Sequence, residues 1–171
     1  MAQNFVTTRQ YSLKEYSPMA FSDSSYNDSR STIFNLFNVA DSSEYLYKLE
    51  LEFVDPIADF SCQVLEMDNS GIDQIDKVLN VKLDYLACCS SITSYYILFK
   101  RSGDIIGLPP LQYNHCDGPE PFKEYRFPSQ KFGENNVIIS TNSFRNTSWE
   151  VDSIAIISRI QLSELTQFSN K

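Results

Sequence analysis

The sequence predicts an all-β fold, a two-sheet antiparallel sandwich of jelly-roll type with about seven or eight strands. Three observations predict it: apolar and polar residues alternate in several short segments, turn residues separate these segments, and helical periodicity is weak. The clearest alternation covers residues 45–54, where one parity is apolar and the other charged. The apolar set is Tyr45, Tyr47, Leu49, Leu51 and Phe53, and the charged set is Lys48, Glu50 and Glu52. Because successive side chains of a strand point to opposite faces, we expect the apolar set to be buried and the charged set to be exposed.

The other elements follow in chain order. Residues 60–67 repeat the alternation, and residues 68–71 are typical of a turn. Residues 72–89 fit both helical and strand spacing, and their side chains favour a short turn or helix over 72–77 followed by a strand over 78–86. Further strands are expected over residues 93–100, 105–108, 122–127, 136–140 and 149–160, with turns over 101–104 and 142–147 and one helical turn in the tail at 163–171.

The first 31 residues differ in character from the rest of the chain. Residues 17–32 are polar, rich in serine and aspartate, and have no sustained period, which is typical of a loop. Aromatic residues are nevertheless spaced along the N-terminal segment, at Phe5, Tyr11, Tyr16, Phe21 and Tyr26. Such rings are expected to lie against a protein surface. We therefore expect a polar N-terminal arm over residues 1–31 and a β-sandwich domain over residues 32–171.

The charge balance argues against nucleic acid and anionic lipid as partners. The chain has 14 Lys and Arg residues against 22 Asp and Glu residues, a net charge of −8 with the histidine neutral, and no basic cluster offsets it. Such a chain is repelled by phosphate groups. No apolar run approaches the roughly 20 residues that a membrane span needs, and the N-terminus lacks the pattern of a secretory signal. We expect an intracellular protein or one within an assembled particle.

The cysteines and the single histidine give little support for catalysis or metal binding. Cys62, Cys88, Cys89 and Cys116 do not form a disulfide framework, so we expect free thiols of a reducing compartment. A cysteine nucleophile needs a nearby imidazole, but His115 and Cys116 are adjacent and would point to opposite sides of an extended segment. One histidine with scattered thiols does not supply a zinc site, and no phosphate-binding loop is present. We therefore expect no catalytic residue, no metal and no cofactor.

The aromatic content is the remaining functional signal, with 12 Phe and 10 Tyr residues. Several of these rings crowd residues 111–128, a Pro-rich segment longer than most connections, and such loops are often functional or interfacial. Core packing accounts for many of the rings, while exposed ones favour a protein interface or stacking on a sugar. The candidate binding residues are Tyr113, Phe122, Tyr125 and Phe127 of this segment, with Tyr96 of the expected strand over 93–100.

These features favour a non-enzymatic protein that works by protein contacts, as an interaction or structural subunit of a larger assembly such as a virion or other particle. We expect a protein partner or self-association. Two alternatives remain open. A carbohydrate-binding jelly-roll module would need an open aromatic platform with Asn, Asp or Arg beside it. A cysteine-dependent enzyme would need a thiol within hydrogen-bond reach of His115.

Overall fold

The computed structural model contains strands and turns with almost no helix in the part of the chain that it describes. The described residues are 4–7, 11–16, 30–38, 45–53, 60–85, 89–116, 121–148, 150–161 and 163–165. The all-β prediction is therefore confirmed for these residues. The chain divides into two compact units, Met1–Cys62 and Gln63–Lys171.

The first unit contains a four-stranded antiparallel sheet with its strands paired in chain order. The strands are β1 (Asn4–Thr7), β2 (Tyr11–Tyr16), β3 (Arg30–Asn38) and β4 (Tyr45–Phe53). The strand expected over residues 45–54 is thus confirmed. The burial expected for its apolar residues lies outside the described side chains, apart from Tyr47, which is half-buried. Since residues 17–29 also lie outside the described part, the arm over residues 1–31 and the domain over 32–171 stay predictions.

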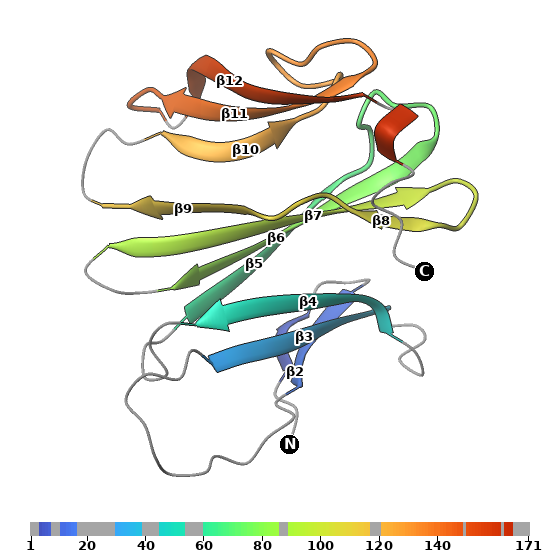
Figure 1. Ribbon diagram of the computed structural model, residues 1–171, viewed down its shortest axis with the longest axis vertical. Helices are drawn as coiled ribbons and strands as arrows, with labels where there is room; N and C mark the ends of the chain where they lie inside the picture. The colour runs from blue at the N-terminus through green and yellow to red at the C-terminus, as the bar shows by residue number, and fades with distance from the viewer. Residues whose placement is uncertain are drawn as a thin grey trace. The chain divides into compact units, whose positions relative to one another are not determined.

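A five-stranded antiparallel sheet makes up one layer of the second unit (Figure 1), and its first strand begins shortly before the unit boundary. The strands are β5 (Phe60–Met67), β6 (Ile75–Tyr85), β7 (Ser90–Lys100), β8 (Ile105–Gly107) and β9 (Leu111–His115). β8 pairs with the C-terminal part of β7 and β9 with its N-terminal part. The two short strands therefore share one edge, which is interrupted at Pro109 and Pro110 because proline has no N–H to donate to the ladder.

The other layer of this unit is a three-stranded antiparallel sheet, whose strands lie side by side in Figure 1. The strands are β10 (Phe122–Arg126), β11 (Val137–Arg145) and β12 (Val151–Gln161). The pairing of β11 with β12 shifts register at two places, between Ser140 and Thr141 and between Phe144 and Arg145. Such bulges are common on edge strands, and β12 is an edge strand of this sheet.

A buried apolar cluster joins the two sheets of the second unit. It combines side chains of the five-stranded sheet with side chains of the three-stranded sheet, among them Val78, Tyr96, Leu98, Ile106, Tyr125, Phe127, Ile138 and Ile160. The rings of Tyr96 and Tyr125 meet edge-on with their centroids 5.1 Å apart. The hydroxyl of Tyr125 donates to the carbonyl of Pro109 at 3.0 Å, so this phenol is buried with its polar atom satisfied. A two-sheet sandwich is thus present, with eight strands in its two sheets.

Several local predictions need correction. β6 begins at Ile75, three residues before the expected start, because residues 73–74 form only a turn, with the Ile75 N–H donating to the carbonyl of Ile72. The expected polar turn over 142–147 starts too early, because β11 continues to Arg145. Within residues 111–128, the strand expected over 122–127 is confirmed as β10, whereas β9 was not expected. The jelly-roll topology is not confirmed, since neighbouring strands in the described sheets are consecutive in the chain except for the pair β7 and β9, and a jelly roll needs Greek-key connections.

The expectation that all four cysteines are free thiols is wrong for two of them. Cys89 and Cys116 form a disulfide. Ser90 of β7 pairs with His115 of β9, so the two cysteines are the next opposed positions at the end of this ladder, with Cα atoms 4.5 Å apart. The antiparallel pairing of β7 with β9 brings the two cysteines together. Their separation of 27 residues in the sequence does not predict this contact. Cys62 is a free thiol.

Candidate functional site

The five aromatic side chains predicted as a binding surface separate into a buried group and a partly exposed pair. Tyr96, Tyr125 and Phe127 are buried in the cluster between the sheets. Tyr113 of β9 and Phe122 of β10 are half-buried, and their rings meet edge-on at 6.2 Å between centroids. Of these five predicted side chains, only Tyr113 and Phe122 are accessible to a ligand, because the first three rings fill the core.

A polar cleft of about 520 Å³ lies beside Tyr113 between β9 and β10, and we call it the β9–β10 cleft. Its polar lining comes from Ser91, Gln112, Asn114, Lys123 and Asn142. The Lys123 ammonium donates to the carbonyl of Gln112 at 3.2 Å. The Oδ1 atom of Asn142 is buried and has no hydrogen-bond partner among the described residues. The cleft therefore offers an acceptor for a ligand donor beside an aromatic ring.

Burial controls the ionisation of two groups near this cleft. It raises the pKa of Tyr113 to about 12, and the carboxylate of Glu124 adds to the rise. Burial also lowers the pKa of Lys82 on β6, while Glu124 acts in the opposite direction. Tyr113 is therefore a neutral hydroxyl at physiological pH, able to donate and to accept hydrogen bonds.

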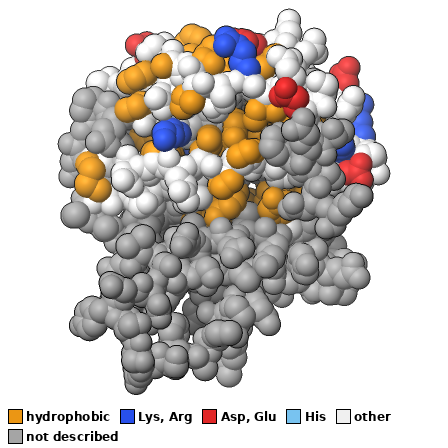
Figure 2. Space-filling view, viewed as in Figure 1, with side chains coloured by type: hydrophobic (Ala, Val, Ile, Leu, Met, Phe, Trp, Pro, Cys, Tyr) orange, Lys and Arg blue, Asp and Glu red, His pale blue; other side chains and the backbone are white. Residues whose placement is uncertain are grey.

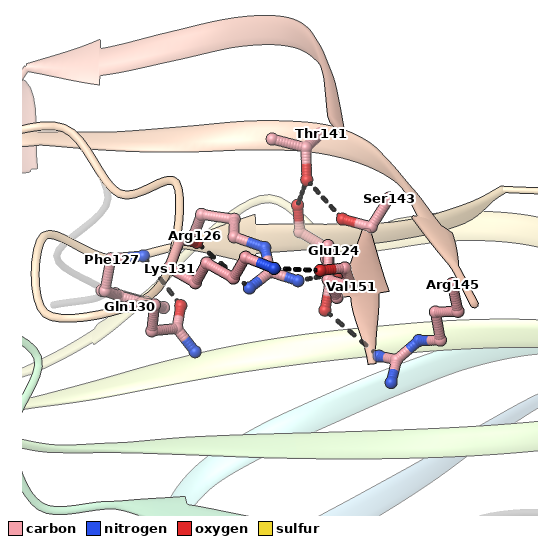
Figure 3. A network of polar contacts seen from close by, with 9 residues as sticks. All are labelled: Glu124, Arg126, Phe127, Gln130, Lys131, Thr141, Ser143, Arg145 and Val151. Atoms are coloured by element: carbon pink, nitrogen blue, oxygen red, sulfur yellow. Dashed lines mark hydrogen bonds and ion pairs between the residues drawn. The ribbon is translucent and has the colours of Figure 1, made fainter. Parts of the chain in front are cut away.

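Charged side chains converge on β10 and β11 around Glu124 (Figure 3). The Glu124 carboxylate forms an ion pair with Arg126, and its second oxygen lies 3.6 Å from the guanidinium of Arg145. Arg145 in turn lies over the ring of Phe122, 5.0 Å from its centroid. Glu124 is opposite Thr141 in the strand register, and alternation places its side chain on the face of β10 opposite to Tyr125.

A second cleft, of about 500 Å³, opens over this network, and we call it the Glu124 cleft. Its lining residues are Glu124, Arg126, Gln130, Lys131, Arg145, Glu150 and Val151. Three of them are cationic and two are anionic, so the lining has an excess of one positive charge. This local excess contrasts with the net charge of −8 of the whole chain.

The loop between β10 and β11 positions one wall of the Glu124 cleft. The Gln130 side chain accepts from the N–H of Phe127 at 2.9 Å, and the Gln130 N–H donates to the carbonyl of Phe127, also at 2.9 Å. The Lys131 carbonyl accepts from Arg126 at 3.4 Å, while the Lys131 ammonium donates to the carbonyl of Val151 at 2.8 Å. These bonds hold Lys131 at the rim of the cleft, between the loop and β12.

Apolar side chains are exposed on β11 and β12. Ile156 and Ile157 of β12 are 38% and 53% exposed, and we call these two residues the β12 strip. Phe144 of β11 is 41% exposed, but the register places its side chain on the opposite face of the sheet from Ile156. Figure 2 shows hydrophobic side chains among uncharged polar ones on one face of the described part, with no gathering of Lys and Arg on that face. Exposed apolar side chains on an edge strand are typical of a contact surface rather than of a nucleic-acid site.

Catalytic and metal chemistry find little support among the described side chains. The sulfurs of Cys89 and Cys116 are joined in the disulfide, so neither is a thiolate nucleophile in this structure. Burial raises the pKa of the Cys62 thiol to about 12, which keeps it protonated and unreactive. The side chains of His115 and Cys88 lie outside the described part. In the described residues, no group of three or more His, Cys, Asp or Glu side chains could hold a metal ion.

Nothing in the sequence singles out Arg126, Lys131 or Arg145. Arg126 and Arg145 meet because β10 and β11 pair antiparallel, which places residues about 20 positions apart in the chain on neighbouring strands, and Lys131 lies in the loop that joins these strands. Two signals were available: the alternation of Glu124, Tyr125 and Arg126, and the position of Arg145 close to the end of a polar run. Neither signal shows which charged residues pair with each other, because the pairing depends on the strand register.

Among the described residues, no helix has the length and hydrophobicity to cross a membrane. Comparison of the chain with protein-family models, with curated proteins and with solved structures finds no match.

Proposed function

We propose that this protein is a non-enzymatic subunit of a larger assembly and that copies of the chain meet along the β12 strip. The observation that carries the proposal is the exposure of Ile156 and Ile157 on an edge strand. Burial of such side chains against a partner is favourable by about 25 cal/mol per Å² of apolar surface. The absence of a nucleophile among the described thiols also favours contact over catalysis.

A second copy of the chain is the occupant that the charges of β12 favour. The strand carries Asp152 near its start and Arg159 near its end; both residues are exposed, and the guanidinium of Arg159 is already paired with Glu134 of the same copy. In an antiparallel arrangement of two copies about a two-fold axis, the start of one strand lies beside the end of the other. The acidic end of each copy then faces the basic end of its partner, with the β12 strip between them. Packing of side chains fits better than extension of the sheet, because the bulges distort the edge of β12.

The experiment is a measurement of native mass by light scattering for the intact chain and for two matched variants. Ile157→Lys places a charge in the β12 strip, whereas Leu65→Lys makes the same kind of change at an exposed aliphatic residue of β5, 44% exposed. We expect the intact chain and Leu65→Lys to associate and Ile157→Lys to be monomeric while folded. A monomeric intact chain, or equal association of both variants, would contradict the proposal.

A carbohydrate-binding role is the second candidate, and the β9–β10 cleft is the observation that favours it. The half-buried Tyr113 lies beside the amides of Gln112, Asn114 and Asn142 in this cleft. An aromatic ring with amides beside it is the combination that sugar recognition uses, since the ring contacts the apolar face of a sugar and the amides bond its hydroxyls.

This second role is tested by screening neutral oligosaccharides against the intact chain, Tyr113→Ala and Asn142→Ala. Binding that both variants weaken would support it, with Gln63→Ala on the exposed face of β5 as the control. Failure of every sugar to bind would remove it without affecting the assembly proposal.

A further inference from the structure

We propose that the Glu124 cleft binds a carboxylate, supplied either by a small free organic acid or by an acidic side chain of a bound protein. This site does not depend on the contact along the β12 strip proposed above. The first observation is charge: Arg126, Lys131 and Arg145 line the cleft against Glu124 and Glu150. A net positive recess on a strongly acidic chain concentrates anions locally, because the low-dielectric walls of a cleft focus the field.

Arg126 is the buried component of the site. It is only 7% exposed, and its Nε atom is buried without a hydrogen-bond partner among the described residues. One terminal nitrogen is paired with Glu124, while the other donates to the Lys131 carbonyl at a long 3.4 Å. A buried guanidinium needs all its donors satisfied, and this one is served by a single carboxylate that it shares with Arg145.

Arg145 and Lys131 are the components that an incoming group can reach. The Arg145 side chain is 27% exposed, and its guanidinium lies over the ring of Phe122, 5.0 Å from the centroid. The Lys131 residue is exposed; among the described residues its ammonium donates to the Val151 carbonyl and lies 4.9 Å from the centroid of the Phe132 ring. Since an ammonium has three N–H donors, it can also donate to a ligand at the rim.

The two carboxylates of the lining favour a singly charged carboxylate over a phosphate. Glu124 and Glu150 repel any anion in this recess, and they repel a dianion more strongly than a monoanion. The planar fork of a guanidinium also fits the planar carboxylate with two parallel hydrogen bonds. We therefore assign the ligand class as monoanionic carboxylate.

The test titrates the full chain with three probes at constant ionic strength and follows backbone amide shifts by NMR. The probes are acetate, inorganic sulfate, and the peptide Ac-Ala-Glu-Ala-NH₂, with Ac-Ala-Gln-Ala-NH₂ as its uncharged match. We expect saturable shifts of Lys131 and Arg145 with acetate or with the Glu peptide, and weaker binding of sulfate. Tighter binding of the Glu peptide indicates a protein side chain as the ligand, and tighter binding of acetate indicates a free acid. Absence of saturation with both carboxylates up to about 100 mM overturns the proposal.

Variants locate the binding. Lys131→Ala and Arg145→Ala should each weaken carboxylate binding by about tenfold or more. Arg159→Ala is the matched control, since Arg159 pairs with Glu134 on the same sheet but does not line the cleft. Glu124→Gln tests whether the carboxylate of Glu124 repels the ligand. Loss of this negative charge should strengthen sulfate binding if the variant folds. Equal affinities of the intact chain, Lys131→Ala and Arg145→Ala for the carboxylate probes would overturn the assignment. Ile157→Lys should bind the probes as the intact chain does.

Discussion

At the scale of single residues, burial of tyrosine hydroxyls makes the fold sensitive to alkaline pH. Burial raises the pKa of Tyr125 to about 12, against 10.0 for an unperturbed group. Because the folded pKa lies above the unfolded one, the folded state holds the proton more tightly. The stabilisation is complete below pH 10 and is lost as the pH rises from there to about 12. Tyr113 behaves in the same sense.

Tyr125→Phe is the residue-scale test of this account. It removes the hydrogen bond to the Pro109 carbonyl and should lower the free energy of unfolding at pH 7 by about 1 kcal/mol. The variant should also lose less stability than the intact chain between pH 9 and pH 11. Urea titrations at several pH values measure both effects, and Tyr113→Phe should likewise reduce the alkaline loss, because burial also raises the pKa of Tyr113. An unchanged alkaline slope in Tyr125→Phe would show that other groups control this pH range.

The residue scale also shows the limit of the sequence in locating a site. Aromatic content directed attention to residues 111–128, but composition does not tell which rings lie between the sheets, and Tyr96, Tyr125 and Phe127 do. The neighbouring residues on β10, Glu124 and Arg126, were not predicted as site residues, because isolated charged residues are usually exposed to solvent. Strand pairing decides both questions, and pairing is a long-range property.

At the scale of elements, alternation predicted the strands well where one face is apolar. The bounds expected for residues 60–67 agree with β5, and Cys62 and Val64 are less exposed than Ser61 and Gln63, as the parity requires. It failed where polar residues are paired inside a sheet. Thr141 and Ser143 of β11 are buried and hydrogen-bond each other. The sequence pattern predicted a turn for this polar run, because the pattern does not show that the polar groups are paired inside the sheet.

The loop between β10 and β11 depends on close backbone approach at Gly133. A Cβ atom on this residue would lie 2.0 Å from the carbonyl oxygen of Phe127, which is backbone and cannot move aside. We expect Gly133→Ala to lower the free energy of unfolding by about 2–4 kcal/mol. Gly103→Ala is the comparison: its φ of +93° disfavours a side chain, but no atom lies within 4 Å, so the cost should be nearer 1 kcal/mol. Thermal unfolding measures the order, and an equal loss in both variants would contradict the steric account.

The Cys89–Cys116 disulfide is expected to stabilise the β7–β9 pairing. A crosslink over 27 residues restricts the unfolded chain by about 3–4 kcal/mol in the chain-entropy model. Cys89→Ser combined with Cys116→Ser should therefore unfold at lower urea concentration than the intact chain, and a reducing agent should not shift it further. Cys62→Ser, which leaves the crosslink intact, should respond to the reducing agent as the intact chain does. A midpoint unaffected by loss of the crosslink would show that β9 is held by its ladder alone.

At the scale of the whole molecule, the net charge of −8 opposes the proposed meeting of copies. Two such chains repel each other, and salt screens this repulsion because the Debye length falls from about 20 Å near 20 mM to about 8 Å at physiological ionic strength. Apolar contacts along the β12 strip are not weakened by these salt concentrations. The exposed contacts between Asp152 and Arg159 contribute little at any salt concentration. Association should therefore strengthen as salt rises.

Sedimentation of the intact chain at 20 and 200 mM NaCl measures this dependence. We expect a dissociation constant several-fold lower at the higher concentration, with Ile157→Lys monomeric at both. Binding to a polyanion would show the opposite sign, since salt weakens it through counterion release. Dissociation of the intact chain as salt rises would mean that opposite charges on neighbouring copies carry the contact. The interface would then lie at the acidic and basic ends of β12 rather than at the β12 strip. In that case, Asp152→Asn should weaken association more than Ile157→Ala.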